Sequence, residues 1–165
     1  MSLLRTAFSV IARALPTERA YAHCDIPCGI YDPIAAKIAA QTVQKMVMRI
    51  QALQKPSPTD STAAWATYEN TLGRYIAVKE EHATLCKKEL LILWTDYFKP
   101  EHLAKFPDLH DAFWKAAKLG STCKQQVNLE AAKELVAAVD RIAVLFWQTK
   151  GVTWHDSVEA ARFGS

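Results

Sequence analysis

Apolar residues recur every three or four positions along most of the chain, which is the spacing of amphipathic α-helices. A first helix is expected after Asp32-Pro33, because aspartate is a good N-cap and proline is tolerated at the first helical position. The helix is predicted to end before Pro56-Ser57-Pro58, and its apolar stripe consists of Ile34, Ile38, Val43, Val47, Ile50 and Leu53.

A second helix is expected from near Asp60-Ser61 as far as Phe98, where Lys99-Pro100 ends it. It carries two apolar stripes, the first with Trp65, Tyr68, Leu72 and Ile76, and the second with Ala83, Cys86, Leu90, Leu93 and Tyr97. Because the two registers do not join across Lys79-Glu80, we expect a bend or a shift of phase there.

Two further helices follow. The shorter one is expected to close at Gly120 and carries Leu109, Phe113 and Ala116. The last stops at Gly151, and its stripe consists of Leu129, Ala132, Val136, Val139, Ala143 and Phe146. Four amphipathic helices with short connections predict an all-α fold, an antiparallel up-and-down four-helix bundle, with residues 152–165 as a loose tail.

Composition and charge exclude some classes of protein. The chain has 165 residues, of which half are hydrophobic and 22% are charged, as in one soluble globular domain. A formal net charge of +3 is too balanced for a nucleic-acid-binding protein with a clustered basic face. No apolar run approaches the roughly 18 residues that span a bilayer, so we expect no membrane partner. Cys86 and Cys123 lie alone in helical patterns and are interpreted as buried packing residues.

Residues 1–22 have the character of a targeting or processing segment. Arg13 interrupts the apolar stretch, which makes a poor export signal, whereas Ala20-Tyr21-Ala22 matches the small-x-small pattern of a cleavage site. Two interpretations stay open: an amphipathic N-terminal helix that remains attached, or a propeptide cut between Ala22 and His23.

The residues directly after this segment include several potential metal ligands. His23, Cys24 and Cys28 provide one imidazole and two thiols within six residues, donors that select transition metals. Three side chains are too few for a closed structural zinc site. Cleavage before His23 would add an α-amino group. The amine, the amide nitrogen and thiolate of Cys24, and the thiolate of Cys28 can then form a square plane, a geometry typical of nickel or copper.

The segment around these donors is suited to a tight hook. The His23 imidazole remains free to bind the metal from above, and the thiolates favour one-electron redox chemistry. Pro27 restricts the linker between the two cysteines, and Gly29 is expected to take a positive φ angle where the chain turns back.

The motif His23-Cys24-Asp25-x-Pro27-Cys28-Gly29-x-Tyr31-Asp32-Pro33 resembles the nickel hook of the nickel-containing superoxide dismutase family. The resemblance extends through Leu93-Trp94-Thr95-Asp96-Tyr97-Phe98-Lys99-Pro100 to Phe146-Trp147. It implies a propeptide over residues 1–22 and a four-helix-bundle domain over residues 23–165, whose hook spans residues 23–31.

The resemblance also implies what the protein does. One nickel per subunit would cycle between +2 and +3 while superoxide is converted to dioxygen and hydrogen peroxide, in a cytoplasmic homohexamer matured by a peptidase. His23, Cys24 and Cys28 are the implied metal ligands, and Asp25, Pro27 and Gly29 support the hook. The His23 imidazole is implied to bind axially in the oxidised state, Tyr31 to stand over the open face of the metal, and Lys99 to attract the anionic substrate near the entrance.

The chain departs from the family pattern at one point. In some members a glutamate and an arginine support the axial histidine, and Ala39 and His82 occupy those positions here. Two other functions stay open: a non-catalytic nickel or copper carrier that uses the same hook, and a purely structural helical protein. An assay for superoxide loss separates the enzyme from the carrier, and substitution of Cys28 by serine tests the structural alternative.

Overall fold

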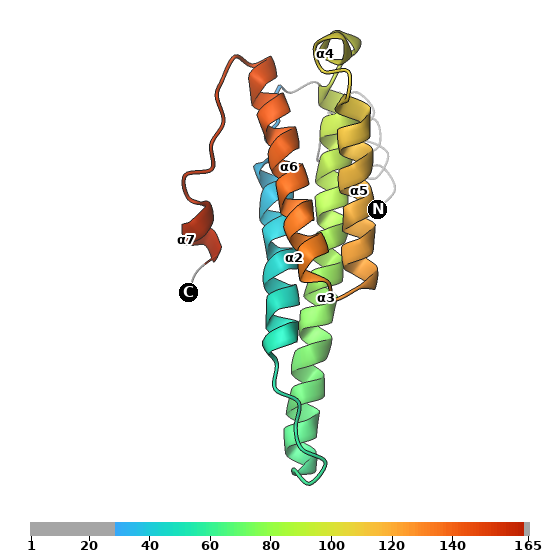
Figure 1. Cartoon of the computed structure of the whole chain (residues 1–165), viewed down its shortest axis with the longest axis vertical. Helices are drawn as coiled ribbons and strands as arrows, with labels where there is room; N and C mark the ends of the chain where they lie inside the picture. The colour runs from blue at the N-terminus through green and yellow to red at the C-terminus, as the bar shows by residue number, and fades with distance from the viewer. Residues whose placement is uncertain (1–28, 164–165) are drawn as a thin grey trace, which may run out of the picture.

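The structure, a computed structural model, describes residues 29–163 and is helical without a strand over that range. Four long helices lie side by side (Figure 1): α2 (Ile34–Ala52), α3 (Thr62–Ile92), α5 (Leu109–Gln125) and α6 (Leu129–Thr149). Successive helices run in opposite directions, and both α2 and α5 pack against α3 and α6. The predicted antiparallel four-helix bundle is confirmed.

Three short elements complete the described chain. A π-helical turn, η1 (Leu93–Tyr97), continues α3, and α4 (Pro100–Lys105) crosses the same end of the bundle. The last element, α7 (Glu159–Phe163), lies beside the bundle. Within residues 29–163, every helix is too short or too polar to span a bilayer.

Polar side chains fix where the helices begin. The Oδ1 atom of Asp32 accepts the backbone N–H of Ile34 at 2.8 Å, and Oγ of Ser61 accepts that of Ala64 at 3.2 Å. Both residues therefore satisfy backbone donors that lack a partner inside the helix. The predicted starts are confirmed to within one or two residues.

A Schellman motif ends α6. The N–H groups of Gly151 and Val152 donate to the carbonyls of Gln148 and Trp147 at 3.2 and 3.0 Å, and Gly151 has φ 70°. Only glycine adopts that backbone angle without steric cost, so the predicted stop at Gly151 is confirmed and explained.

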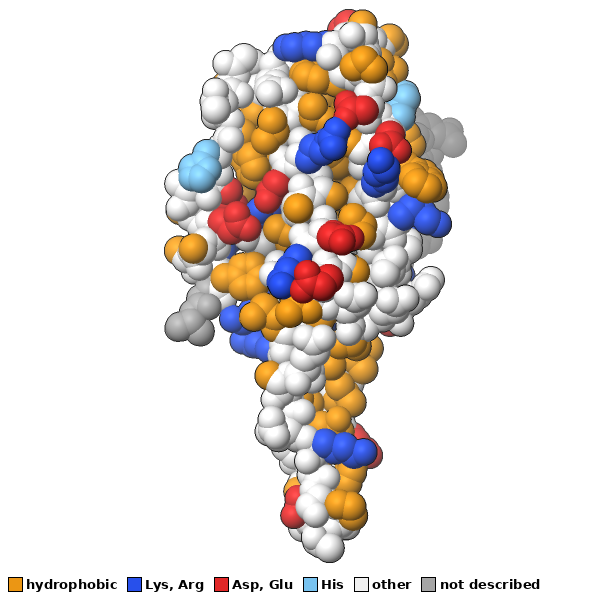
Figure 2. All heavy atoms as spheres, viewed as in Figure 1, with side chains coloured by type: hydrophobic (Ala, Val, Ile, Leu, Met, Phe, Trp, Pro, Cys, Tyr) orange, Lys and Arg blue, Asp and Glu red, His pale blue; other side chains and the backbone are white. Residues whose placement is uncertain are grey.

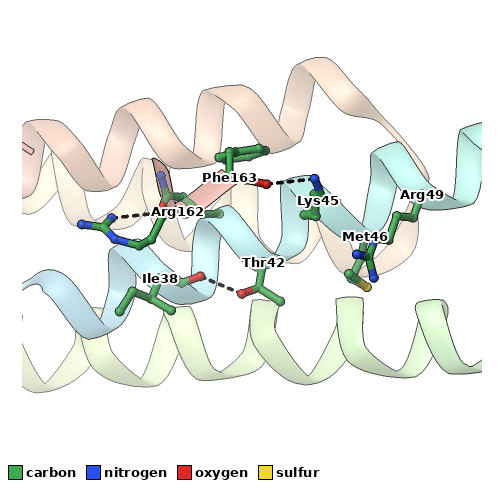
Figure 3. A pocket seen from close by; sticks show the side chains of 8 residues that line it. Ile38, Thr42, Lys45, Met46, Arg49, Arg162 and Phe163 are labelled. Atoms are coloured by element: carbon green, nitrogen blue, oxygen red, sulfur yellow. Dashed lines mark hydrogen bonds between the residues drawn. The ribbon is translucent and has the colours of Figure 1, made fainter. Parts of the chain in front are cut away.

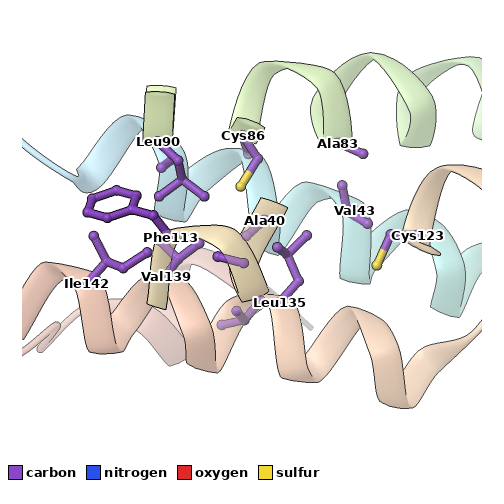
Figure 4. Close-up of a cluster of buried hydrophobic side chains, with 14 of the residues drawn as sticks. Ala40, Val43, Ala83, Cys86, Leu90, Phe113, Cys123, Leu135, Val139 and Ile142 are labelled. Carbon is purple, nitrogen blue, oxygen red and sulfur yellow. The ribbon is translucent and has the colours of Figure 1, made fainter. Parts of the chain in front are cut away.

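The apolar faces of the four helices meet in one core (Figure 4). Cys86 and Cys123 are fully buried free thiols, which confirms their packing role. Burial raises the pKa of the Cys86 thiol to about 12 and also raises that of Cys123. Ile38 was wrongly placed in the buried stripe: it is 46% exposed, because the face of α2 that meets the core is formed by Ala36, Ala39, Ala40, Val43 and Val47.

The shift of register predicted at Lys79-Glu80 has a tertiary cause. Helix α3 runs through these residues without interruption, but its buried residues begin only at Lys79. The N-terminal half of α3 extends beyond the ends of α5 and α6, beside the end of α2 and the connection that follows it (Figure 1). The first apolar stripe therefore belongs to a two-helix projection and the second to the bundle.

The prediction that Gly120 closes its helix is wrong. It lies inside α5, and a Cβ atom there would come within 2.9 Å of Lys87 Cγ on α3. The glycine therefore permits a close approach of two helices, and α5 continues to Gln125.

The expected loose tail is docked over residues 152–163. Lys37, fully buried on α2, forms ion pairs with Asp140 of α6 and, at 3.1 Å, with Glu159 of α7. Figure 3 shows Lys45 donating to the backbone oxygen of Phe163. On the face seen in Figure 2, acidic and basic side chains are interspersed, as the balanced net charge leads one to expect.

The tail is also braced internally. Arg162 forms two hydrogen bonds with the carboxylate of Asp156, at 2.6 and 2.7 Å. These bonds hold the pKa of Asp156 below its ordinary value. Polar contacts of this kind, which hydrophobic periodicity does not report, keep residues 152–163 on the bundle.

Candidate active site

The expected metal ligands His23, Cys24 and Cys28 lie outside the described residues, as do Ala22, Asp25 and Pro27. Within residues 29–163 no group of three or more histidine, cysteine, aspartate or glutamate side chains could hold a metal. The donor set expected of the hook, with two thiolates, an imidazole, an amine and an amide nitrogen, fits nickel by its chemistry.

The described chain begins where the hook is expected to join the bundle. Gly29 has φ 73°, which confirms the positive angle predicted for it. A Cβ atom at Gly29 would meet nothing within 4 Å, so the backbone angle rather than space favours glycine here.

Gly29 opens onto a cavity of about 300 Å³, which lies between the start of the described chain, η1, α4 and the end of α6. Tyr31 and Lys99, both singled out from the sequence, line this cavity together. Its walls are formed by Gly29, Tyr31, Asp96, Tyr97, Lys99, Glu101, His102 and Lys150.

Tyr97 is the centre of the aromatic wall. Its ring centroid lies 5.4 Å from that of Tyr31 and 4.4 Å from that of Phe146, and it stacks on His102 at 5.7 Å with an interplanar angle of 13°. The sequence placed Tyr97 in the second apolar stripe of its helix. The structure shows that it both packs on the core and lines the cavity.

The π-helical turn sets the direction of these aromatic rings. Phe98 N–H donates to the carbonyl of Leu93, five residues earlier, at 3.1 Å. Within the turn, Trp94 stacks on Phe113 of α5 at 5.9 Å, whereas Tyr97 faces Tyr31. A π turn inserts one extra residue into a helix and is frequently found at functional sites.

Hydrogen bonds fix the polarity of the Tyr97 hydroxyl. Thr149 Oγ1 donates to the carbonyl of Phe146 at 2.6 Å and also bonds Tyr97 Oη. Because a hydroxyl has only one proton, the bond between the two side chains is donated by Tyr97. The tyrosine therefore directs its proton at Thr149.

The charged groups of the cavity are two lysines and two carboxylates. Lys150 Nζ lies 5.3 Å from the ring centroids of both Tyr97 and Phe146. The backbone N–H of Lys99 donates to His102 Nδ1 at 3.0 Å, which places the proton of a neutral imidazole on Nε2. Lys150 was missed in the sequence because nothing local indicates which helix end meets the hook.

Ala39 and His82, the two positions at which the chain departs from the family pattern, do not line this cavity. Ala39 is buried in the core, and His82 is half-buried with its Nδ1 atom 2.9 Å from the carbonyl of Val78 on its own helix. Among the described residues, His82 is thus engaged with α3 rather than with the groups around Tyr31.

The described chain is an antiparallel four-helix bundle with a cavity lined by tyrosine and lysine side chains, and this cavity begins at Gly29, one residue after the Cys24–Cys28 motif of the sequence. The sequence model of the family described as nickel-containing superoxide dismutase matches residues 18–150. The chain therefore belongs to the nickel-containing superoxide dismutase family.

Individual relatives agree with this assignment. "Superoxide dismutase [Ni]" of Streptomyces seoulensis is 33% identical over 135 residues, which cover 82% of this chain and 93% of the relative. The enzyme of the same name from Streptomyces coelicolor is 34% identical over 138 residues, with the same coverage.

Solved structures extend the agreement to the fold. The native structure of nickel superoxide dismutase superposes with a TM-score of 0.67 and 31% identity, over 79% of this chain and all of that chain. The structure with nickel ligation of the oxidised state gives a TM-score of 0.66 and 32% identity over the same shares.

Proposed function

We propose that this chain is a nickel superoxide dismutase whose active site forms at the N-terminus created by cleavage between Ala22 and His23. The observation that carries the proposal is that Gly29, directly after the Cys24–Cys28 motif, opens onto the cavity shared by Tyr31 and Lys99. The relatives named above are superoxide dismutases, which favours the enzyme over a metal carrier.

In the proposed reaction two superoxide anions and two protons give one dioxygen and one hydrogen peroxide. Nickel, when bound, supplies the one-electron redox chemistry between its +2 and +3 states. His23, Cys24 and Cys28 would hold it through the amine, the imidazole, the Cys24 amide and the two thiolates, and Asp25, Pro27 and Gly29 would keep the hook closed.

The described residues bind and orient the substrate. Lys99 attracts the anion to the cavity, an effect that salt weakens. Tyr31, whose ring packs against that of Tyr97 at a tilt of 56°, limits how large a molecule can approach the hook and restricts access to small species such as superoxide.

A single extra residue tests the proposal. One protein is produced to begin at His23 and a matched control to begin at Ala22, and each is reconstituted with nickel before its metal content and superoxide consumption are measured. We expect nickel and activity only in the protein that begins at His23, because only there is the amine of His23 a ligand. Full activity in the control would refute the proposed site.

Side-chain substitutions complete this test. Cys28→Ser is expected to abolish nickel binding, whereas His155→Gln, which changes an exposed histidine of the tail, should leave it intact. Nickel binding without superoxide consumption in the protein that begins at His23 would instead identify a carrier.

We also propose a homohexamer. In support, Leu91 of α3 is 52% exposed and lines a cavity together with Leu90, Trp94 and Phe113, and Trp114 of α5 is 57% exposed. Contiguous exposed apolar surface is typical of protein–protein contacts. Native mass spectrometry of the processed protein tests the assembly, and a monomer at micromolar concentration would contradict it.

Processing is proposed to occur in the cytoplasm through a maturation peptidase that removes residues 1–22. The support is the apolar run interrupted by Arg13, which is a poor export signal, together with the Ala20-Tyr21-Ala22 pattern before His23. Fractionation of cells followed by N-terminal sequencing tests both points, and processed protein found only outside the cytoplasm would contradict them.

A further inference from the structure

We propose that Lys150 is a second substrate-attracting cation of this site, acting together with Lys99. The proposal rests on the superoxide dismutase function proposed above and adds a residue that is far from the hook in the sequence. Lys150 follows the last residue of α6 and lines the cavity that contains Tyr31 and Lys99.

The ammonium group of Lys150 has a defined place. Its Nζ lies 5.3 Å from the ring centroids of both Tyr97 and Phe146. Aromatic faces attract cations at this range, so the charge is held at the cavity wall although the side chain is exposed.

The backbone on both sides of Lys150 is also fixed. Thr149 accepts a hydrogen bond from the Tyr97 hydroxyl, and Gly151 closes the Schellman motif with φ 70°. The position of Lys150 is therefore determined by Thr149 and Gly151 as well as by the rings of Tyr97 and Phe146.

The formal charges of the described cavity wall indicate that Lys150 favours an anion there. Among the described lining residues, Lys99 and Lys150 contribute +2 and Asp96 and Glu101 contribute −2, so that these formal charges cancel. Without Lys150 the same wall would carry −1 and would repel superoxide.

The carboxylates of residues 29–163 leave both ammonium groups to a bound anion. Within residues 29–163, neither Lys99 nor Lys150 forms an ion pair with a carboxylate. Asp96 Oδ1 instead lies 2.7 Å from Thr95 Oγ1, whose hydroxyl is shared with the carbonyl of Leu91 at 2.8 Å. Since the Tyr97 proton is directed at Thr149, the positive partners that the described walls offer are the two lysines.

The decisive experiment measures kcat/KM against ionic strength for nickel-loaded, processed protein. Lys150→Gln is compared with Lys99→Gln, and Lys133→Gln serves as a matched control, because Lys133 lies near the other end of α6 and pairs with Glu130 at 2.8 Å. Lys150→Arg, which keeps the charge, tests for rescue.

We expect Lys150→Gln to lower kcat/KM about 3-fold at low ionic strength, as loss of one charge near the path of an anion predicts. The difference should vanish at roughly 0.5 M salt, where the screening length is only a few ångströms. Lys133→Gln and Lys150→Arg should follow the wild type. A wild-type salt dependence in Lys150→Gln, or a loss of rate that is equal at every ionic strength, would overturn the proposal.

A second measurement is independent of turnover. Metal-free protein is titrated with azide, a small singly charged anion, and the NMR signals of the Tyr97 ring are followed. We expect azide to shift these signals and Lys150→Gln to weaken its binding about 3-fold.

The two measurements separate the two proposals. If the wild type does not consume superoxide, the proposed function fails and the azide titration alone decides the role of Lys150 as an anion-binding cation. If the wild type is active and Lys150→Gln behaves like it in both measurements, only the role of Lys150 is refuted.

Discussion

Replacing Lys79 by methionine tests how much one buried ammonium group contributes to the bundle. Lys79 is 2% exposed, and its Nζ donates to the backbone carbonyls of Cys123 and Lys124 at 2.5 and 2.7 Å, with Gln126 at 3.4 Å. These carbonyls lie at the C-terminal end of α5, where helical partners are missing. A side chain of α3 thus completes the end of α5.

Two opposing effects set the size of the loss. The two short hydrogen bonds to a charged donor contribute about 3–6 kcal/mol together. Against them stands the cost of burying the ammonium, which also lowers the pKa of Lys79 below its ordinary value. Methionine removes both effects and leaves the carbonyls without this donor. We expect a net loss of about 3 kcal/mol in the free energy of unfolding.

The assay is thermal and urea-induced unfolding followed by circular dichroism, with Lys79→Met beside Lys87→Met. A loss of about 3 kcal/mol corresponds to a fall in Tm of roughly 6–12 °C for a chain of this size. Lys87 lies on the same helix, but among the described residues its Nζ donates one hydrogen bond, to Ser121 Oγ at 2.9 Å, and its side chain is partly exposed, so the loss should be smaller, about 1 kcal/mol. Equal stability of Lys79→Met and wild type, or equal losses in the two variants, would refute this reasoning.

Three further predictions concern the core and the C-terminal end. Burial raises the pKa of Cys86 to about 12 and also raises the pKa of Cys123, so neither thiol should react with Ellman's reagent at pH 8 until the protein unfolds. The contribution of Cys86 to the free energy of unfolding should also decline as the pH rises from 9.0, the ordinary pKa of a cysteine, toward 12. The lowered pKa of Asp156 means that its bond to Arg162 stabilises the protein above pH 3.8 and that this contribution is lost as pH falls below it; the Tm difference between wild type and Asp156→Asn should shrink accordingly. Gly151→Ala should cost about 1 kcal/mol in urea unfolding, since it forces a positive φ on alanine, and no loss would contradict the Schellman motif.

The sequence predicted the features of the fold that short-range chemistry determines. Asp32 and Ser61 at helix starts and Gly151 at a helix end act within a few residues of themselves, so their roles could be predicted. Gly120 has the same residue type as Gly151 but another cause, the approach of Lys87 from α3. Such contacts depend on which helices meet, which periodicity does not encode.

The same distinction applies to the site. Tyr31 and Lys99 were singled out through a resemblance in motif, and the structure brings them to one cavity. Lys150 escaped notice because its position beside Tyr97 results from the antiparallel order of the helices, which brings the end of α6 to the start of the described chain. The stretch 152–163 was misjudged because buried Lys37 holds it through charges rather than through an apolar stripe.

The π-helical turn at Leu93–Tyr97 constrains how this protein can change by insertion and deletion. Removing one residue from the turn would allow α3 to continue as a regular helix, which is the more favourable backbone. It would also rotate everything that precedes the turn by about 100° relative to everything that follows it. Trp94 and Tyr97 could then no longer face α5 and the cavity at once. The extra residue is therefore a length requirement that a single deletion would violate, even if the shortened helix were the more stable one.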